Sequence, residues 1–195
     1  MTFLIKGGKI FLKLMRIEDI SKACQLLKSN SAKMISDSFG DDMDAEDRQN
    51  SLKNILESNS NDRFHFLAYT TKGKKLVGYA FVSNINWIKG SGELALIVDD
   101  KYTGIGYGSL INITIINYCF NELNLKKVYS KIRTDNDNIP DRIKGQLLRK
   151  VLSGNNDATG AVYTDYYYRE WLKKEWIKDE LIVKFCNLMN MENIY

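Results

Sequence analysis

Three alternate glycines within one short run are the feature of this sequence best suited to hold a ligand. The run consists of Lys101, Tyr102, Thr103, Gly104, Ile105, Gly106, Tyr107 and Gly108, and it lies between an apolar stretch typical of a strand and an apolar stretch typical of a helix. Glycines let the main chain approach a phosphate closely, and the amides at a helix N-terminus present positive potential to an anion. The run therefore predicts a phosphate-binding loop. A glycine-rich turn without a ligand is the plainer alternative.

The spacing of the loop disfavours two other classes of phosphate site. A nucleotide-hydrolysing loop needs Lys and then Ser or Thr directly after its last glycine, whereas Ser109 and Leu110 follow Gly108 here. A dinucleotide fingerprint spaces its glycines differently and follows the first strand of a repeated parallel unit. Nucleotide hydrolysis and hydride transfer are therefore both poor interpretations of this loop.

The stretches before the loop predict strands and helices that would position it. A strand over Lys9 to Leu14 precedes a helix opened by Glu18 and Asp19, and the polar stretch from Ser36 to Asn61 contains a second helix over Arg48 to Leu56. Three runs rich in aromatic and branched residues then follow with short turns, and they predict an antiparallel meander. These runs are Arg63 to Thr70, Lys75 to Ile85 and Glu93 to Val98.

The stretches after the loop predict a mixed sheet. Ser109 to Leu123 is so apolar that this helix must be buried, and the strand after it, Lys126 to Arg133, should run parallel to Glu93 to Val98. A weakly amphipathic helix, a Tyr-rich strand and a helical tail are expected next, over Asp141 to Leu152, Ala161 to Arg169 and Trp171 to Tyr195. The expected fold class is α/β (α+β), with a mixed, mostly antiparallel central sheet flanked by helices.

The composition bounds the function. A chain of 195 residues with 44% hydrophobic and 27% charged residues predicts one globular domain over residues 1–195. The net charge of +4 comes from dispersed lysines, so nucleic acid is not indicated as a partner. Cys24, Cys119 and Cys186 are expected to be buried free thiols. No apolar run reaches the ~18 residues of a membrane span and no signal peptide is recognisable, so we expect a cytoplasmic protein.

The stretch from Gly92 to Asn138 resembles the core motif of the GCN5-related N-acetyltransferase (GNAT) superfamily. That motif, Arg/Gln-x-x-Gly-x-Gly/Ala after the fourth strand, is matched by Lys101 to Gly106 with lysine in the first place. Tyr107-Gly108 together with the string from Phe120 to Val128 is similar to the branch that includes ribosomal-protein N-terminal acetyltransferases. The predicted element order extends the resemblance over roughly the first 140 residues, and the part after that diverges.

The resemblance implies a set of binding roles. Acetyl-CoA would be the co-substrate, its pantetheine arm paired with the strand at Leu96, Ile97 and Val98 and its pyrophosphate held by the loop amides. The family's cofactor-orienting asparagine would be Asn136 or Asn138, of which Asn138 is preferred. The acceptor would be a primary amine of a small molecule, such as an amino sugar, or a protein N-terminus. The resemblance also suggests a homodimer formed through Ala161 to Trp176.

Acyl transfer to an amine requires a base and benefits from an acid. Glu93 resembles the family's general-base carboxylate, and an exposed strand-end glutamate is the alternative. The family's proton-donating tyrosine is missing from the helix that should follow Asn138. The Tyr-rich strand contains four tyrosines that could replace it, although alternating aromatic residues in a strand are more often explained by sheet packing, and the sequence singles out none of them as the acid. They are Tyr163, Tyr166, Tyr167 and Tyr168. A catalytically silent GNAT-like module that binds CoA or a protein partner is therefore the alternative function.

Metal chemistry has no support in the sequence. The one histidine, His65, stands between Phe64 and Phe66 in an alternating strand, which predicts a structural or cleft-lining role. The cysteines are too far apart for a ligand set. No metal site is expected.

Overall fold

The computed structural model describes residues 4–28, 44–58, 60–133, 149–154 and 163–188 of the chain. Within these ranges the strands are β1 (Leu4–Gly7), β2 (Ile10–Leu14), β3 (Phe64–Thr70), β4 (Leu76–Asn86), β5 (Ser91–Val98), β6 (Lys127–Arg133), β7 (Arg149–Gly154) and β8 (Tyr163–Leu172). The helices are α1 (Ile20–Leu26), α2 (Ala45–Glu57), α3 (Tyr107–Asn121), α5 (Lys173–Trp176) and α6 (Glu180–Leu188).

The described strands form one mixed sheet in the order β1-β2-β3-β4-β5-β6-β8-β7. Every neighbouring pair is antiparallel except β5 and β6, which are parallel. The strand-helix-strand unit β5-α3-β6 explains this exception, because a helical crossover returns the chain in the same direction. The predicted fold class, the meander and the parallel pair are confirmed.

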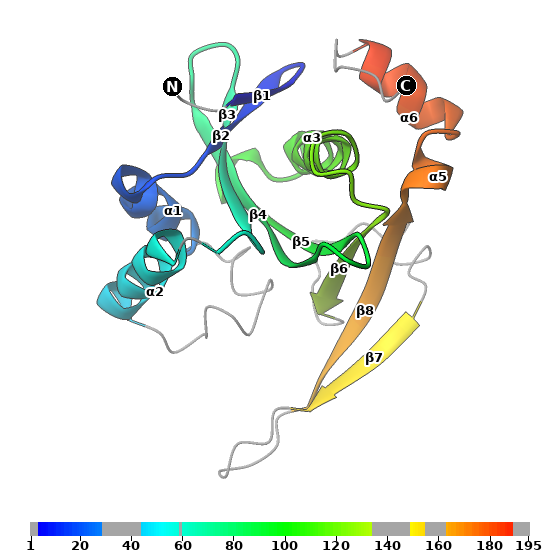
Figure 1. Ribbon diagram of the computed structural model, residues 1–195. Helices are drawn as coiled ribbons and strands as arrows, with labels where there is room; N and C mark the ends of the chain where they lie inside the picture. Colours follow the sequence, from blue (N-terminus) through cyan, green and yellow to red (C-terminus); the bar gives the residue numbers. More distant parts are fainter. Residues whose placement is uncertain (1–3, 29–43, 59, 134–148, 155–162, 189–195) are drawn as a thin grey trace.

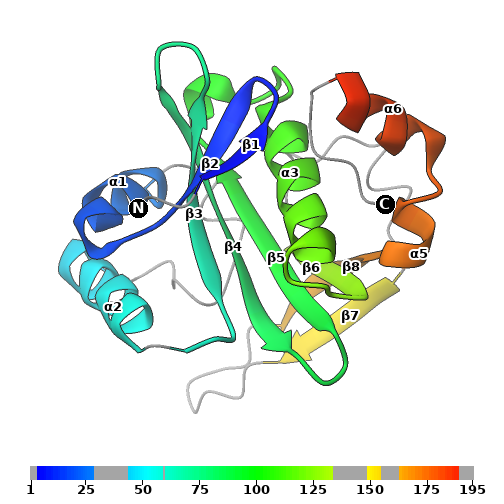
Figure 2. The ribbon, with the colours of Figure 1, turned by 45° about the horizontal axis from the view of Figure 1, so that its top comes forward.

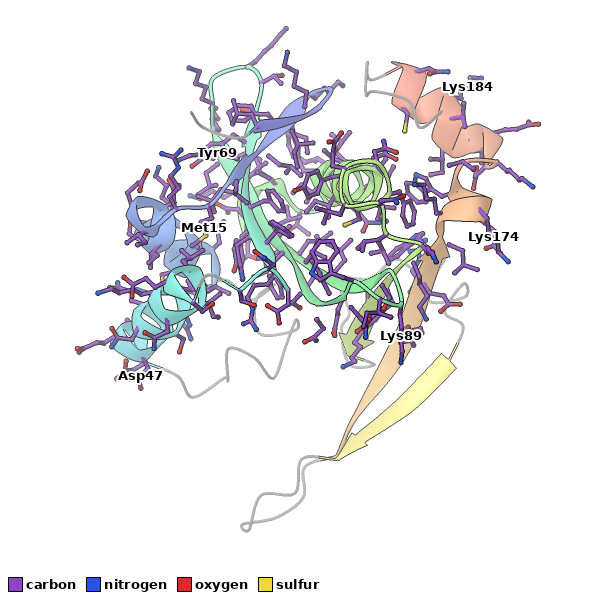
Figure 3. The ribbon with its side chains drawn as sticks, viewed as in Figure 1. Met15, Asp47, Tyr69, Lys89, Lys174 and Lys184 are labelled. Carbon is purple, nitrogen blue, oxygen red and sulfur yellow. The ribbon has the colours of Figure 1, made fainter. Side chains whose placement is uncertain are left out.

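Helices cover both faces of the sheet. Figures 1 and 2 show α3 lying along one face, with α5 and α6 beside it, and α1 with α2 on the opposite face. Charged side chains such as Asp47 of α2 and Lys184 of α6 point outward into solvent (Figure 3). The tail is fastened to α3 by side chains: the Trp176 indole donates to Asn117 Oδ1 at 2.7 Å, and Asn117 Nδ2 contacts Cys186 Sγ at 3.1 Å.

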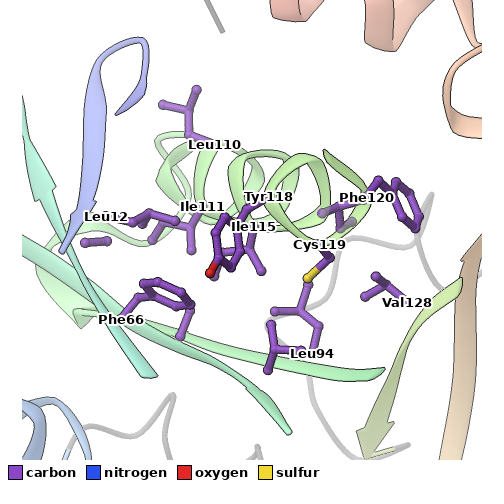
Figure 4. Packing of buried hydrophobic residues seen from close by; sticks show 14 of the residues in the cluster. Leu12, Phe66, Leu94, Leu110, Ile111, Ile115, Tyr118, Cys119, Phe120 and Val128 are labelled. Atoms are coloured by element: carbon purple, nitrogen blue, oxygen red, sulfur yellow. The ribbon is translucent and has the colours of Figure 1, made fainter. Parts of the chain in front are cut away.

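Helix α3 is the centre of the larger core. Nine of its fifteen residues are buried, which is typical of a helix that is apolar around most of its circumference. Its side chains pack against the sheet, as Figure 4 shows for Ile111, Ile115 and Cys119 opposite Leu94 and Phe66. This packing fixes the N-terminus of α3 beside the end of β5.

The N-terminal hairpin of β1 and β2 was not predicted from the sequence as a hairpin. β1 pairs with β2 from Leu4↔Lys13 to Gly7↔Ile10, and Gly7 lies directly against Thr114 of α3, where a Cβ would overlap the threonine side chain. Gly7 and Gly8 provide the signal in the sequence, since Gly8 adopts a positive φ of 68° in the turn.

Two predictions for the C-terminal part are wrong. Residues 149–152, expected to be helical, belong to strand β7, which pairs with β8 over Arg149↔Tyr168 to Gly154↔Tyr163. Trp171 and Leu172, expected to begin a helical tail, continue β8 opposite Val128 and Lys127. Pairing with a neighbouring strand outweighs weak helical periodicity in both places. Residues 141–148 of the expected helix lie outside the described residues.

A buried ion cluster joins β2 to α1. Asp19 has a side chain that is only 1% exposed, and it accepts hydrogen bonds from Lys13 Nζ at 2.6 Å and from Lys22 Nζ at 3.3 Å. Burial by itself would raise the pKa of Asp19. Hydrogen bonds from Lys13, Lys22 and the Arg16 amide outweigh burial, so the pKa of Asp19 lies below its ordinary value of 3.8.

Asp19→Asn is expected to lower the free energy of unfolding by about 2 kcal/mol, because it leaves the Lys13 ammonium without its partner. The pKa of Asp19 is lower in the folded state than in the unfolded chain. The stabilisation is therefore complete above the unfolded value and is lost as pH falls through the folded one. Urea unfolding of both proteins should thus converge at acidic pH. Glu18→Gln, an exposed carboxylate in the same turn, is the control, and an equal effect of the two changes would contradict the assignment.

Candidate functional site

The glycine run forms a loop followed at once by α3. Asp99 accepts a hydrogen bond from Lys101 N at 3.0 Å and begins a short 3-10 turn over Asp100–Tyr102. Gly104 and Gly106 then adopt φ values of 80° and 95°, which are strained for other residues. Gly106 is the N-cap of α3. The glycines at these two positions are thus required by the backbone path into the helix.

The loop presents free amides to open space. Within the described residues, no main-chain amide from Gly104 to Ser109 donates a hydrogen bond to another group. A Cβ built on Gly104 or Gly106 meets no atom within 4 Å, and one on Gly108 meets only Val98 Cγ2 at 3.4 Å. The first turn of α3 carries no acidic side chain, so the helix dipole is not neutralised there. These features together can hold an anion such as a diphosphate.

Strand β5 separates from β6 next to this loop. The parallel pairing covers Ser91↔Lys127, Gly92↔Val128 and Glu93↔Tyr129, and no further β5–β6 pair follows among the described residues. Directly after the last pair, the side chain of Ser130 takes the place of a main-chain donor: its hydroxyl donates a hydrogen bond to Leu94 O at 2.7 Å. β5 continues to Val98 while paired only with β4 on its other side. Leu96, Ile97 and Val98 therefore expose main-chain groups on the β6 side, where an extended amide-bearing ligand could pair with them.

Gly78 keeps β4 close to both parts of this site. Gly78 pairs with Val98 at the end of β5. A Cβ on Gly78 would lie 2.5 Å from Ile97 O and 2.8 Å from Ile111 Cδ1 of α3. A larger residue would push apart the strand and the helix that carry the site.

Glu93 occupies the last pair before the strands separate. Leu94, Leu96 and Val98 face α3, whereas Ala95 and Ile97 pack with the α1–α2 side, so the alternation of the strand turns Glu93 toward that second side. Its side chain is 17% exposed, accepts a hydrogen bond from Asn84 Nδ2 at 3.0 Å, and lies 3.7 Å from Lys131 Nζ. A carboxylate that is held in place but still accessible can accept a proton from an amine.

Asn84 is oriented by an irregularity in β4. The β4–β5 register shifts between Ser83 and Asn86, and Asn84 there has a positive φ of 51°. Asparagine tolerates this conformation better than most residues, and bulges often direct a side chain next to a functional site. The bulge thus points the Asn84 amide at Glu93.

Tyr129 is the register partner of Glu93 across the parallel pair. Its ring stacks on Tyr168 at 5.3 Å, with Lys127 Nζ 5.9 Å from the ring centroid. Burial, the negative charge of Glu93 and a hydrogen-bonding contact with that carboxylate raise the pKa of Tyr129 to about 12. The tyrosine is therefore protonated at neutral pH and can serve as a donor.

His65 is a structural residue. It is 5% exposed, stacks on Phe81 at 5.4 Å, and its Nδ1 lies 2.6 Å from the Tyr79 hydroxyl. Burial and the nearby Arg63 charge lower the pKa of His65 to about 4, so the ring is neutral at neutral pH. The structure thus favours the first of the two roles expected for His65.

The other predicted ligand residues are either exposed or outside the described ranges. Lys101, Thr103 and Ile105 are exposed on the loop, Ile105 at 67%. Tyr102 and Tyr107 are half-buried and make an edge-to-face contact at 5.6 Å. Asn138 lies outside the described residues. Among those residues, no three His, Cys, Asp or Glu side chains are grouped so that they could hold a metal ion. No helix of the described ranges is long and apolar enough to cross a bilayer.

The sequence of residues 9–139 matches the acetyltransferase (GNAT) domain family. The chain therefore belongs to the GNAT acetyltransferases, which are acyl-CoA-dependent N-acetyltransferases. A search among curated protein sequences gives no match.

Several solved structures that are similar to the chain are acetyltransferases, and they share its fold. The spermidine/spermine N-acetyltransferase SpeG from Vibrio cholerae, in complex with manganese ions, has a TM-score of 0.67 at 18% identity, covering 89% of this chain and 98% of that chain. A point mutant of the same spermidine N-acetyltransferase has a TM-score of 0.64 at 19% identity, covering 86% and 95%. A protein described as a putative acetyltransferase has a TM-score of 0.72 at 15% identity, covering 93% and 95%.

Asn84, Ser130 and Tyr129 were not anticipated as site residues. The sequence offered one indirect signal: Asn84 interrupts an apolar strand, which can mark a bulge. The relation of Tyr129 and Ser130 to Glu93 and Leu94 depends on the parallel register, which no local pattern specifies.

Proposed function

We propose that the chain transfers an acetyl group from acetyl-CoA to a primary amine of a small cationic molecule. The observation that carries the proposal is the separation of β5 from β6 after Glu93, beside a loop whose amides from Gly104 to Ser109 have no hydrogen-bond acceptor in the part of the chain that the structure describes. One ligand that has both an extended amide-bearing arm and a diphosphate suits the two features together.

Each site residue would have a distinct role in binding acetyl-CoA or in proton transfer. Amides from Gly104 to Ser109 bind the pyrophosphate, and the free side of Leu96 to Val98 pairs with the pantetheine. Glu93, held by Asn84 at 3.0 Å, takes the proton from the attacking amine directly or through a water molecule. Acetyl-CoA, when bound, supplies a thioester whose acyl carbon can be attacked. Asn138 remains a proposed contact to the same ligand.

The acceptor face favours a cationic small molecule. Glu93 stands beside the stacked rings of Tyr129 and Tyr168, and a carboxylate with aromatic rings binds an ammonium well. Lys131 Nζ now lies 3.7 Å from Glu93, and an acceptor ammonium can replace it there. The structural similarity to spermidine N-acetyltransferases makes polyamines the first acceptors to test.

The test is a coenzyme A release assay with acetyl-CoA and a panel of spermidine, spermine, putrescine, glucosamine and a peptide with a free N-terminus. We expect kcat/KM for the best small amine to exceed that for the peptide by at least about tenfold. Preference for the peptide would support the protein N-terminus as acceptor. Binding of coenzyme A by calorimetry without turnover of any amine would support the silent module.

A further inference from the structure

The proposed reaction lacks a proton donor for the departing thiolate, because the helix expected to carry one contains no tyrosine. From the register of β5 and β6, we propose that Tyr129 is this donor and that Glu93 then returns a proton to the Tyr129 hydroxyl. The inference deepens the acetyltransferase proposal and depends on it.

The position of Tyr129 follows from the sheet. Glu93 and Tyr129 form the last parallel pair, so both stand where the gap between the strands begins. Val128 packs in the α3 core, so alternation along β6 turns Tyr129 to the opposite face, which is also the face of Glu93. A thioester whose pantetheine follows Leu96 to Val98 toward this closed end brings its sulfur next to both side chains.

The proton balance closes within this pair. The amine nitrogen forms a bond to the acyl carbon, the carbon–sulfur bond breaks, and its electron pair leaves with sulfur as thiolate. Glu93 accepts the proton that the amine loses. Tyr129 gives its hydroxyl proton to the thiolate and regains one from Glu93, so the products are the amide and the free thiol, with both side chains restored.

The charge on Glu93 makes the transfer conditional. The negative carboxylate contributes to the high pKa of Tyr129, so the phenol is a poor donor while Glu93 is ionised. Once Glu93 has taken the amine proton that contribution disappears, and the phenol becomes more acidic when the thiolate forms. Asn84 already holds the carboxylate at 3.0 Å, and a catalytic hydrogen bond such as one between Tyr129 and Glu93 commonly tightens in the substrate complex.

Other tyrosines of the described site are less well placed. Tyr102 and Tyr107 belong to the loop at the diphosphate end. Tyr168 lies one strand beyond Tyr129, and its ring stacks on Tyr129 rather than lying where β5 and β6 separate. Tyr129 is the tyrosine directly across the parallel pair from Glu93 and on the same face of the sheet.

Tyr129→Phe is the test, with acetyl-CoA and spermidine or the fastest amine of the panel. We expect kcat to fall about 30-fold, below the usual range for an acid catalyst, because a thiolate of pKa near ~8.5 leaves fairly well unaided. The KM and calorimetric Kd of acetyl-CoA should stay within about twofold. Raising the imidazole buffer concentration at fixed pH and ionic strength should partly restore kcat of the variant and leave wild-type kcat unchanged.

Two further variants keep the test decisive. Tyr69→Phe removes a phenol on β3, away from the point where β5 and β6 separate, and should retain wild-type kcat. Tyr168→Phe removes the neighbouring hydroxyl but keeps the ring that faces the acceptor, and should lower kcat less than Tyr129→Phe does. The proposal is overturned if Tyr129→Phe keeps kcat within about threefold, if it loses acetyl-CoA affinity and kcat together, or if Tyr168→Phe has the larger effect. Failure of wild type to turn over any amine would instead overturn the proposed function.

Discussion

Glu93→Gln is expected to lower kcat by about 10²–10³-fold, because the amide cannot take a proton from the attacking amine. Glutamine keeps the size of the side chain and an oxygen that can accept the Asn84 hydrogen bond, so the fold and the KM of acetyl-CoA should change little. Steady-state rates from neutral to alkaline pH are the measurement. Wild-type kcat at every pH would refute the base assignment.

Glu170→Gln is the matched control for this change. Glu170 lies on β8, is 28% exposed, and pairs with Lys127 at 3.5 Å, so the same charge is removed from the same sheet without touching Glu93. We expect kcat within about twofold of wild type. If both variants lost activity equally, the loss would reflect the charge of the sheet rather than a base at Glu93.

Gly106→Val is expected to weaken coenzyme A binding by at least about 50-fold. The added side chain projects into the open space beside the free amides and shifts the N-cap of α3, so fewer amides reach a diphosphate, and two or three lost charged hydrogen bonds cost this much. A β-branched residue at a φ of 95° is strained as well, at about 1–2 kcal/mol of stability. Calorimetry with coenzyme A measures the affinity.

Gly73→Val separates the two effects. Gly73 has a φ of 77° in the β3–β4 turn, with only Lys75 side-chain atoms near its Cβ position, at 3.9 Å. The backbone strain is therefore comparable, while the turn carries no part of the site. We expect a similar loss of stability and unchanged affinity for coenzyme A. Equal affinity losses in both variants would show that the glycine loop does not hold the ligand.

The sequence predicted the elements whose residues carry strong local patterns. Apolar residues such as Ile111, Ile115 and Phe120 are so frequent in α3 that the sequence predicts a buried helix. The alternating run of β3 predicts a strand. Residues 149–152 carried no comparable pattern, and their conformation is decided by pairing with β8. The single-domain prediction for residues 1–195 stays a prediction.

The loop could be predicted because glycine adopts positive φ values that other residues disfavour. Gly104 and Gly106 do adopt such values in the structure. The remainder of the candidate site arises from register: Asn84, Tyr129 and Ser130 approach β5 from two different neighbouring strands, at sequence separations that no motif spans.

The similarity to the ribosomal-protein branch rested on the string from Phe120 to Val128 together with Tyr107-Gly108. Phe120, Leu125 and Val128 of that string are buried at the end of α3 and the start of β6. Core residues of this kind recur across a fold and do not choose an acceptor. The assignment to that branch stays a prediction.

The burial of all three cysteines has a practical use at the bench. Desolvation raises the pKa of both the Cys24 and the Cys119 thiol, and thiols that remain protonated and covered react slowly with disulfide reagents. A chromogenic aromatic disulfide added to the native enzyme should therefore report liberated coenzyme A with little background colour from the protein itself. A rapid burst of colour without any acyl donor would reveal local opening of the core around these thiols.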